Sequence, residues 1–350
     1  MRGGVILNKV SIIGSGSWGT ANAISLASKG LDVKLWVRDD ELLKEINEKR
    51  ENTTYLPGVT LSNKIVASND LEYCCKASDI IVLGTPSHAI RDTMKNIKKY
   101  INKEQYIVNL AKGIENDSLC RMSQIIEEYL PQNPVAVLSG PNHAEEVARN
   151  MPSATVVSSK YKKVAEFIQD IFMTPRFRVY VNPDIVGVEL GGALKNIIAL
   201  GAGISDGLGF GDNTKTALMT RGIVEIARLG VAMGARQSTF SGLSGVGDLI
   251  VTCTSMHSRN RRAGIAIGQG KTLEEVLGST KMVIEGVRTT KSAYQLAKKF
   301  SIEMPITQEI YGVLYKGSDV KESVIKLMTR NKTHEIEELL ETERVDWKDA

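Results

Sequence analysis

Short apolar runs alternate with amphipathic segments through the first part of the chain. The apolar runs are bounded by polar or glycine-rich residues, which predicts buried strands at Val10–Ile13, Val33–Val37, Ile65–Ala67, Asp79–Leu83, Tyr106–Leu110, Val135–Leu138, Ala154–Ser158 and Phe177–Val181. The segments between them predict helices, among them Ile90–Tyr100, Leu119–Tyr129 and Tyr161–Ile171. Because strands and helices alternate, we expect a mostly parallel sheet that is covered on both faces.

The pattern changes after Val181, where strand signals almost disappear. Asp184 is typical of a helix N-cap, and a long apolar segment rich in glycine and alanine follows from Ile185 to Ile204. Later segments carry helical apolar spacing or capping residues, and predict helices at 214–233, at 290–299 and in the acidic tail 335–350. A further helix is predicted after Thr272, which has Glu275 as its capping partner. We therefore predict two domains, an α/β domain over residues 1–184 and an all-α domain over residues 185–350.

Length and composition are those of an ordinary soluble globular protein. The chain has 350 residues, 42% of them hydrophobic and 24% charged, which favours two domains over one. Its 44 basic residues exceed its 40 acidic residues by a net charge of +4, without a basic block, so nucleic acid is not indicated as a partner. The 4 cysteines lack metal-ligand spacing, and we expect no metal site.

Apolar stretches give no sign of export or membrane insertion. The run near the N-terminus is too short for a signal peptide, and no stretch reaches the roughly 18 uncharged apolar residues that a membrane span requires. Reduced thiols fit a cytosolic protein best. We therefore expect a cytoplasmic protein without a membrane span.

Glycines with the spacing G-x-G-x-x-G follow the first predicted strand directly. Gly14 permits a tight turn, Gly16 allows a pyrophosphate to approach the backbone, and Gly19 allows helix and strand to pack closely. A helix that begins here presents free N–H groups and the positive end of its dipole to phosphate. The context of strand, turn and helix predicts a dinucleotide-binding domain of the Rossmann type.

Arg38 follows the second predicted strand, where side chains face the adenosine ribose of a bound dinucleotide. An arginine can pair with a 2′-phosphate or stack on adenine, which favours NADP. The alternative is an arginine exposed to solvent, with the acidic residues after it capping the next helix. The cofactor is therefore NADP or NAD.

Lys195 is the lone lysine of the long apolar helix. Burial of its cation is costly, and desolvation would lower its pKa toward the range of a general acid or base. The alternative is a lysine whose ammonium group reaches solvent.

A second group of polar residues lies between Phe240 and Gly264. Asp248 follows a run of glycines, and Ser258, Arg259 and Asn260 precede a predicted short helix at 261–267. An anion there would meet Arg259 together with helix N–H groups. The alternative is a basic surface exposed to solvent.

Several sequence blocks, in this order and spacing, closely resemble the NAD(P)-dependent sn-glycerol-3-phosphate dehydrogenases, in particular the soluble bacterial type. The blocks read GSGSWGTA (14–21), NLAKGIE (109–115), SGPNHAEE (139–146), ELGGALKNIIALGAGI (189–204), GVGDLIVTC (245–253) and SRNRRAG (258–264), and later EGVRTT (285–290) and MPITQEIYGVLYKG (304–317). The resemblance implies an oxidoreductase that interconverts dihydroxyacetone phosphate and sn-glycerol 3-phosphate with NAD(P)H, supplies glycerol 3-phosphate for phospholipid synthesis and forms a homodimer.

The resemblance also implies roles for individual residues. Catalytic positions correspond to Lys195, Lys112 and Asp248. Substrate-contacting positions correspond to Lys112, Gly140, Asn142, Lys195, Asp248, Ser258, Arg259 and Asn260, although Asn142 stands where serine or threonine is expected. Cofactor-contacting positions correspond to Gly14, Gly16, Ser17, Trp18, Gly19, Arg38, Lys112, Ala144, Arg259, Val283 and Glu285.

Two other functions are compatible with parts of this pattern. A β-hydroxyacid dehydrogenase would share the nucleotide domain, the helical domain and the interdomain lysine, but its substrate would carry a carboxylate in place of the phosphate. A non-catalytic module that senses NAD(P) would need neither Lys195 nor Lys112, so the presence of both lysines argues against it.

Overall fold

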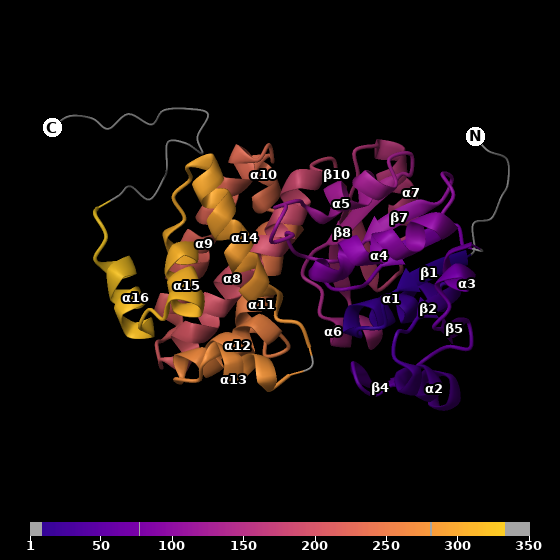
Figure 1. Cartoon of the computed structure of the whole chain (residues 1–350), viewed down its shortest axis with the longest axis horizontal. Coiled ribbons are helices and arrows are strands. Elements are labelled where there is room, and N and C mark those ends of the chain that lie inside the picture. The colour runs from indigo at the N-terminus through magenta and orange to yellow at the C-terminus, as the bar shows by residue number, and fades with distance from the viewer. Residues whose placement is uncertain (1–8, 77, 281, 333–350) are drawn as a thin grey trace.

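The computed structural model describes residues 9–76, 78–280 and 282–332. A region built on a β-sheet lies at the N-terminal side, and a region built from helices lies beside it (Figure 1). The helix predicted in the acidic tail 335–350 falls outside the described residues.

The sheet has 8 strands in the order β10-β9-β8-β7-β6-β1-β2-β5. These strands are β1 (Lys9–Ile13), β2 (Asp32–Trp36), β5 (Ile65–Ser68), β6 (Ile80–Leu83), β7 (Tyr106–Asn109), β8 (Val135–Ser139), β9 (Ser153–Ser158) and β10 (Phe177–Asn182). Neighbouring strands run parallel except β8 and β9, which are antiparallel. The predicted fold class, a mostly parallel α/β sheet followed by a helical region, is confirmed.

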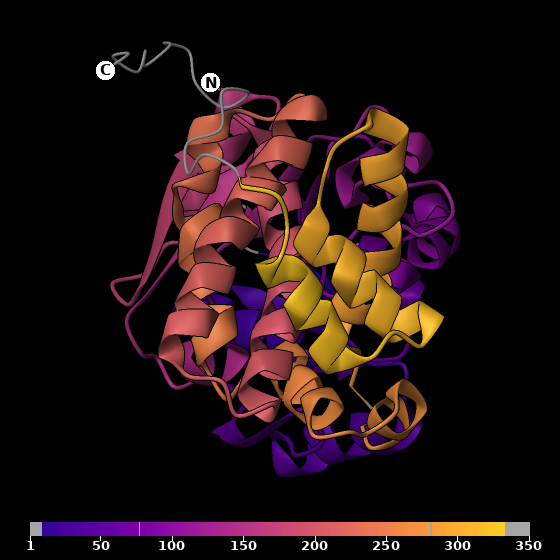
Figure 2. The same ribbon diagram turned by 90° about the vertical axis from the view of Figure 1, so that its left-hand side faces the viewer.

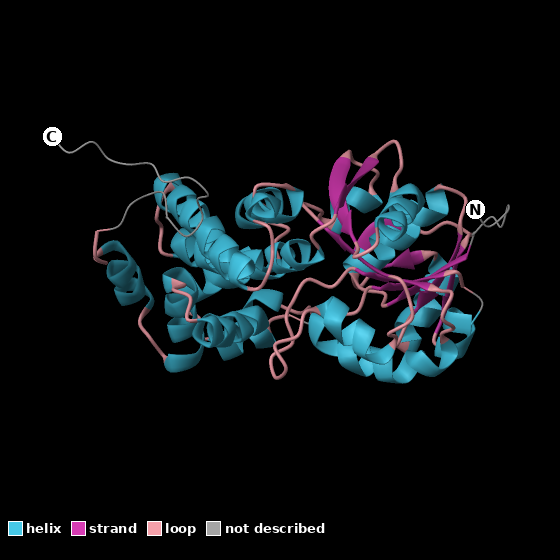
Figure 3. Cartoon of the chain, turned by 90° about the horizontal axis from the view of Figure 1, so that it is seen from above, coloured by secondary structure: helices cyan, strands magenta, loops and turns pink. Residues whose placement is uncertain are grey.

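Both faces of the sheet are buried, as Figure 3 shows by the helices on either side of the strands. In β1, Ile12 packs into a core with Leu26 of α1 (Ser17–Ser28), whereas Ile13 packs into a second core with Met94 of α4 (Ile90–Ile97). Successive strand residues point to opposite faces, which explains why these strands read as continuous apolar runs. The other helices of this region are α2 (Asp40–Lys49), α3 (Leu71–Lys76), α5 (Met122–Tyr129), α6 (Ala144–Ala148) and α7 (Lys162–Phe172).

Helix α8 (Ile185–Gly207) forms the centre of the helical region, which faces the viewer in Figure 2. Asp184 caps it by accepting a hydrogen bond from the Gly187 N–H at 2.9 Å, as predicted. Around it lie α9 (Asp212–Ala232), α10 (Gln237–Phe240), α11 (Asp248–Thr254), α12 (Arg259–Gly268), α13 (Leu273–Gly278), α14 (Glu285–Phe300), α15 (Pro305–Lys316) and α16 (Val320–Met328).

Close packing against α12 buries α8 almost completely. A Cβ atom at Gly203 would collide with the carbonyl oxygen of Arg261, and one at Gly264 would collide with that of Leu200. Among the described residues, α8 is the one helix long and apolar enough to cross a membrane, but 89% of its apolar window is buried in the protein. Its hydrophobicity is therefore explained by its place in the core.

Some element boundaries differ from the sequence predictions. Helix α12 begins at Arg259 rather than at 261, because the Ser258 hydroxyl caps it by accepting a hydrogen bond from the Arg261 N–H at 3.2 Å. Helix α14 begins at Glu285 rather than at 290. Its first turn is held by two hydrogen bonds to distant residues: the Ser87 N–H donates to Glu285, and the Gly286 N–H donates to Asn260. A hairpin of β3 (Glu51–Asn52) and β4 (Leu56–Thr60), and helix α3, were not predicted.

Candidate active site

The glycine turn after β1 has the shape that a dinucleotide requires. Gly14 has a φ of +121°. A Cβ atom added to Gly14 would lie only 2.8 Å from the backbone of Gly84. A Cβ at Gly19 would collide with the carbonyl oxygen of Gly14. Gly16 caps α1 without a side-chain hydrogen bond, and a Cβ there would meet nothing within 4 Å. The N-terminus of α1 is therefore open to a phosphate group.

The next cofactor candidates lie around this turn. Ser17 and Trp18 form the start of α1, and the Trp18 ring packs edge-on against Phe177 with centroids 6.4 Å apart. Arg38 lies two residues after Trp36, the last residue of β2, and its side chain is exposed. Asp39 caps α2 by accepting a hydrogen bond from the Leu42 N–H at 2.8 Å, as the alternative interpretation of Arg38 expects of the acids that follow it.

Lys195 is buried in α8 and its ammonium group is paired. Its Nζ donates to Oδ1 of Asp248 at 2.6 Å and to Oγ1 of Thr252 at 2.5 Å. Burial lowers the pKa of Lys195 to about 8, while Asp248 acts in the opposite direction. The alternative in which this lysine reaches solvent is therefore wrong, because only 6% of the residue is exposed.

Lys112 approaches the same carboxylate from the sheet region. It lies in the loop after β7, and its Nζ donates to Oδ2 of Asp248 at 2.7 Å and to the carbonyl oxygen of Gly140 at 2.8 Å. Asp248 is 1% exposed, and its two carboxylate oxygens each accept from one lysine. Two cations from opposite regions thus share one buried anion, an arrangement that fixes both ammonium groups.

The glycine run before Asp248 lets this residue reach α8. Residues Leu243–Gly247 form a π-helical turn that leads into α11. A Cβ at Gly245 would collide with the backbone of Phe240, and one at Gly191 would lie 2.5 Å from the carbonyl oxygen of Ser244. The close approach of the two backbones therefore depends on these glycines.

The residues predicted to bind phosphate lie at the start of α12. Ser258 is the N-cap, and the exposed side chain of Arg259 has no hydrogen-bond partner among the described residues. Asn260 is buried, and its Nδ2 donates to Oδ1 of Asn196 at 2.8 Å while its Oδ1 accepts from the Gly286 N–H at 2.9 Å. One amide N–H of Asn260 remains for a ligand.

The remaining candidates belong to the walls of the site. Glu285 accepts hydrogen bonds from the N–H of Ser87 at 3.0 Å and from its hydroxyl at 2.6 Å, across the two regions. Ala144 is buried in the first turn of α6, and Val283 is half-buried before α14. Asn142 donates from Nδ2 to the carbonyl oxygen of Ala154 at 2.9 Å, so this amide holds the loop.

Sequence reasoning missed several residues of this site. Thr252 follows Asp248 by one helical turn, so helical spacing could have indicated it. Asn196 follows Lys195 directly and contacts Asn260 of α12, so helical spacing around Lys195 does not indicate it. Ser87 lies 198 residues from its partner Glu285, and nothing in the local sequence indicates that contact. Each of the three orients a residue that was predicted.

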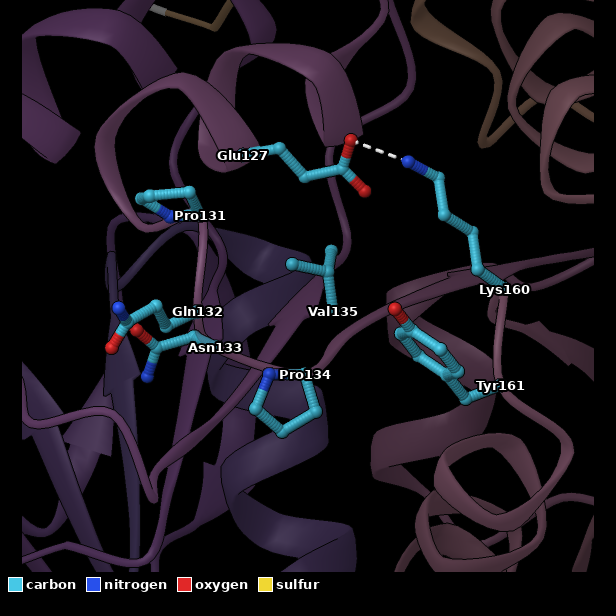
Figure 4. A pocket seen from close by; sticks show the side chains of 8 residues that line it. All are labelled: Glu127, Pro131, Gln132, Asn133, Pro134, Val135, Lys160 and Tyr161. Carbon is cyan, nitrogen blue, oxygen red and sulfur yellow. Dashed lines mark hydrogen bonds and ion pairs between the residues drawn. The ribbon is translucent and has the colours of Figure 1, made fainter.

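A surface hollow of ≈ 460 Å³, seen from close by in Figure 4, has a different lining. It is lined by Glu127, Pro131, Gln132, Asn133, Pro134, Val135, Lys160 and Tyr161, and Lys160 pairs with Glu127 at 2.7 Å on its rim. None of the predicted site residues lines it. Across residues 9–76, 78–280 and 282–332, no group of three or more His, Cys, Asp or Glu residues could hold a metal ion.

Comparison with known proteins identifies both regions of the chain. Residues 9–165 match the family described as NAD-dependent glycerol-3-phosphate dehydrogenase N-terminus, and residues 184–325 match the corresponding C-terminus. A glycerol-3-phosphate dehydrogenase [NAD(P)+] of Moorella thermoacetica is 56% identical over 329 residues, which cover 94% of this chain and 98% of that protein. The protein of the same name from Bacillus subtilis is 52% identical over 339 residues, covering 96% of this chain and 98% of that one.

A solved structure agrees with these matches. The crystal structure of glycerol-3-phosphate dehydrogenase from Coxiella burnetii superposes with a TM-score of 0.89 at 37% identity, and covers 92% of this chain and 99% of that chain. The two family matches therefore lie one in the sheet region and one in the helical region. The chain therefore belongs to the family of NAD(P)-dependent glycerol-3-phosphate dehydrogenases.

Proposed function

We propose that this chain is an oxidoreductase that interconverts dihydroxyacetone phosphate and sn-glycerol 3-phosphate, with NADPH or NADH as the hydride carrier. The observation that carries the proposal is the pairing of Lys195 and Lys112 with one buried carboxylate, Asp248. A carbonyl oxygen that receives a hydride at its carbon needs a proton and positive charge nearby, and these two lysines supply both.

In the proposed mechanism Lys195 is the general acid for reduction. Because its pKa is about 8, the ammonium group is mostly protonated at neutral pH but releases its proton more readily than an exposed lysine does. Asp248 and Thr252 fix the position of Nζ. Lys112 adds positive charge beside the oxygen and stabilises the developing alkoxide. When bound, the nicotinamide cofactor supplies the hydride.

The substrate phosphate binds at the start of α12 in this proposal. Arg259 is exposed and free of partners among the described residues, so it is available for a charge-assisted pair. Ser258 and Asn260 flank it, and Gly140 and Asn142 line the opposite side of the substrate site. The N–H groups at the N-terminus of this ten-residue helix favour an anion at the same place.

The cofactor binds over the glycine turn after β1. Gly14, Gly16 and Gly19 shape the turn, Ser17 and Trp18 follow it, and Arg38 faces the ribose. We propose that further cofactor contacts come from residues near the boundary between the two regions. These residues are Lys112, Ala144, Arg259, Val283 and Glu285.

We extend the proposal to the setting of the enzyme. The boundary between the nucleotide domain and the helical domain falls between residues 184 and 185. The protein is a cytoplasmic homodimer, and its product supplies glycerol 3-phosphate for phospholipid synthesis. Light scattering on the purified protein tests the dimer, since a monomeric mass would exclude it.

The decisive test of the function is turnover on a substrate panel. The protein should oxidise NADPH with dihydroxyacetone phosphate and fail to do so with 3-oxo acids, because carboxylate substrates lack the phosphate group. Faster turnover of a 3-oxo acid would indicate a β-hydroxyacid dehydrogenase instead. Absence of turnover with every substrate, together with tight cofactor binding, would indicate a non-catalytic module.

A further inference from the structure

Two arginines and a histidine lie at the outer mouth of the cofactor site, and only one of these residues was predicted. Arg38 follows β2, His88 belongs to the 3-10 turn Ser87–Ala89 after β6, and Arg288 belongs to α14 of the helical region. All three side chains are exposed. Within residues 9–76, 78–280 and 282–332, none of the three has a hydrogen-bond or ion-pair partner.

Strand order brings Arg38 and His88 to the same edge of the sheet. Strands β6, β1 and β2 are consecutive neighbours and run parallel, so their carboxyl ends meet at that edge. Neighbouring strands lie about 4.8 Å apart, which separates the ends of β2 and β6 by about 10 Å. Side chains as long as arginine and histidine can both reach an anion placed between them.

A hydrogen-bonded contact brings Arg288 to the same place. The carboxylate of Glu285 accepts from the N–H of Ser87 at 3.0 Å and from its hydroxyl at 2.6 Å, which fixes the start of α14 against the turn that carries His88. Arg288 lies three residues after Glu285 and therefore on the same face of the helix.

Arg38 and Arg288 make no ion pair within the described residues. Burial lowers the pKa of His88, and Arg288 and Arg38 lower it further, so the ring is neutral at neutral pH. The carboxylates beside Arg38 make other hydrogen bonds, because Asp39 caps α2 and Asp40 accepts from Asn69 at 2.9 Å. An anion bound between the two arginines would pair with both of them, and the His88 ring can donate an N–H to it.

We propose that Arg38, His88 and Arg288 together form the binding site for the 2′-phosphate of NADPH, with Arg288 contributed by the helical region across the cleft. This inference rests on the proposed function, since it requires a dinucleotide over the glycine turn. NADH presents a neutral hydroxyl at the same position and would leave the two arginines unpaired. The chain is then expected to prefer NADPH.

The test measures binding of two small ligands that differ only in this phosphate, 2′,5′-ADP and 5′-AMP, by titration calorimetry without turnover. The native protein should bind 2′,5′-ADP at least about tenfold more tightly. In Arg288→Gln that advantage should fall about tenfold, whereas the affinity for 5′-AMP should stay within about twofold. Arg288→Lys should recover part of it.

Arg176→Gln is the matched control, because Arg176 is exposed beside β10 at the opposite edge of the sheet. It should change neither affinity. If Arg288→Gln does not fold, His88→Gln should lower the same ratio by a smaller factor. Equal losses for both ligands, or no loss in either variant, would overturn the proposal. A native protein that binds both ligands equally would overturn this site alone, and one that binds neither would overturn the proposed dinucleotide function.

Discussion

The boundary between the sheet region and the helical region holds two groups of cations, which are paired within the protein at one end and unpaired at the other. At its inner end Lys195 and Lys112 are paired with Asp248, and every partner distance is between 2.5 and 2.8 Å. At its outer end Arg38 and Arg288 are exposed and have no partner among the described residues. A buried cation must be paired within the protein, whereas an exposed one is solvated by water until a ligand replaces that water.

This difference separates chemistry from recognition. Pairing with Asp248 and Thr252 sets the position of Lys195, and burial lowers its pKa, before any substrate arrives, as proton transfer requires. The exposed arginines are not paired before a ligand binds, and they contribute to binding affinity only when an anion is present. We therefore expect substitutions at the inner end to reduce turnover and those at the outer end to reduce affinity.

The largest expected effect is at Lys195. Changing Lys195→Ala should lower the turnover rate by about 100-fold to 10,000-fold, the usual range for loss of a general acid, and should alter the dissociation constant of NADPH little. Stopped-flow turnover and fluorescence titration of NADPH measure the two quantities. Lys298→Ala, an exposed lysine of α14, is the control and should keep native turnover. Near-native turnover in Lys195→Ala would remove this residue from the mechanism.

Arg259 should give the next largest effect. Its removal should weaken the binding of dihydroxyacetone phosphate by about 10-fold to 150-fold, which corresponds to a charge-assisted pair of about 1.5 to 3 kcal/mol. Dihydroxyacetone, which lacks the phosphate, should be a poor substrate of the native protein and hardly worse for Arg259→Ala.

The comparison of both substrates in both proteins isolates the phosphate contact. Arg262→Ala is the matched control, because Arg262 is an exposed arginine of the same helix. If Arg259→Ala reduces activity by the same fraction with both substrates, Arg259 acts through the fold or the cofactor, and its assignment to the phosphate is wrong.

Arg38 tests the outer end, with a smaller effect. Arg38→Asp should raise the Michaelis constant for NADPH by about tenfold or more and affect NADH less, because only NADPH carries a 2′-phosphate. Steady-state kinetics with both cofactors measure the ratio. Equal losses with NADPH and NADH would mean that Arg38 stacks on adenine or supports the fold.

Sequence analysis predicted the buried parts of the molecule better than the exposed ones. The strands of the main sheet were all predicted. Burial on both faces makes central strands such as β6 and β8 continuous apolar runs, and strands nearer the edges, such as β5 and β10, alternate buried and exposed residues. Lys195 was predicted because a lone lysine in an apolar helix conflicts with its surroundings. Arg288 gave no such signal, since a charged residue on an amphipathic helix is ordinary. Ser87 was missed because its role depends on a contact made far along the chain.

The central claim is that Lys195 transfers the proton. The most direct test is the pH dependence of kcat/KM of the native enzyme, measured for reduction and for oxidation of the substrate. Its pKa of about 8 predicts that kcat/KM for reduction of dihydroxyacetone phosphate falls about tenfold per pH unit above pH 8, as the ammonium proton is lost. For oxidation of glycerol 3-phosphate, which needs neutral Lys195, kcat/KM should rise with pH and level off above about 8. A profile without these opposite limbs, or one that persists unchanged in Lys195→Met, would contradict the account.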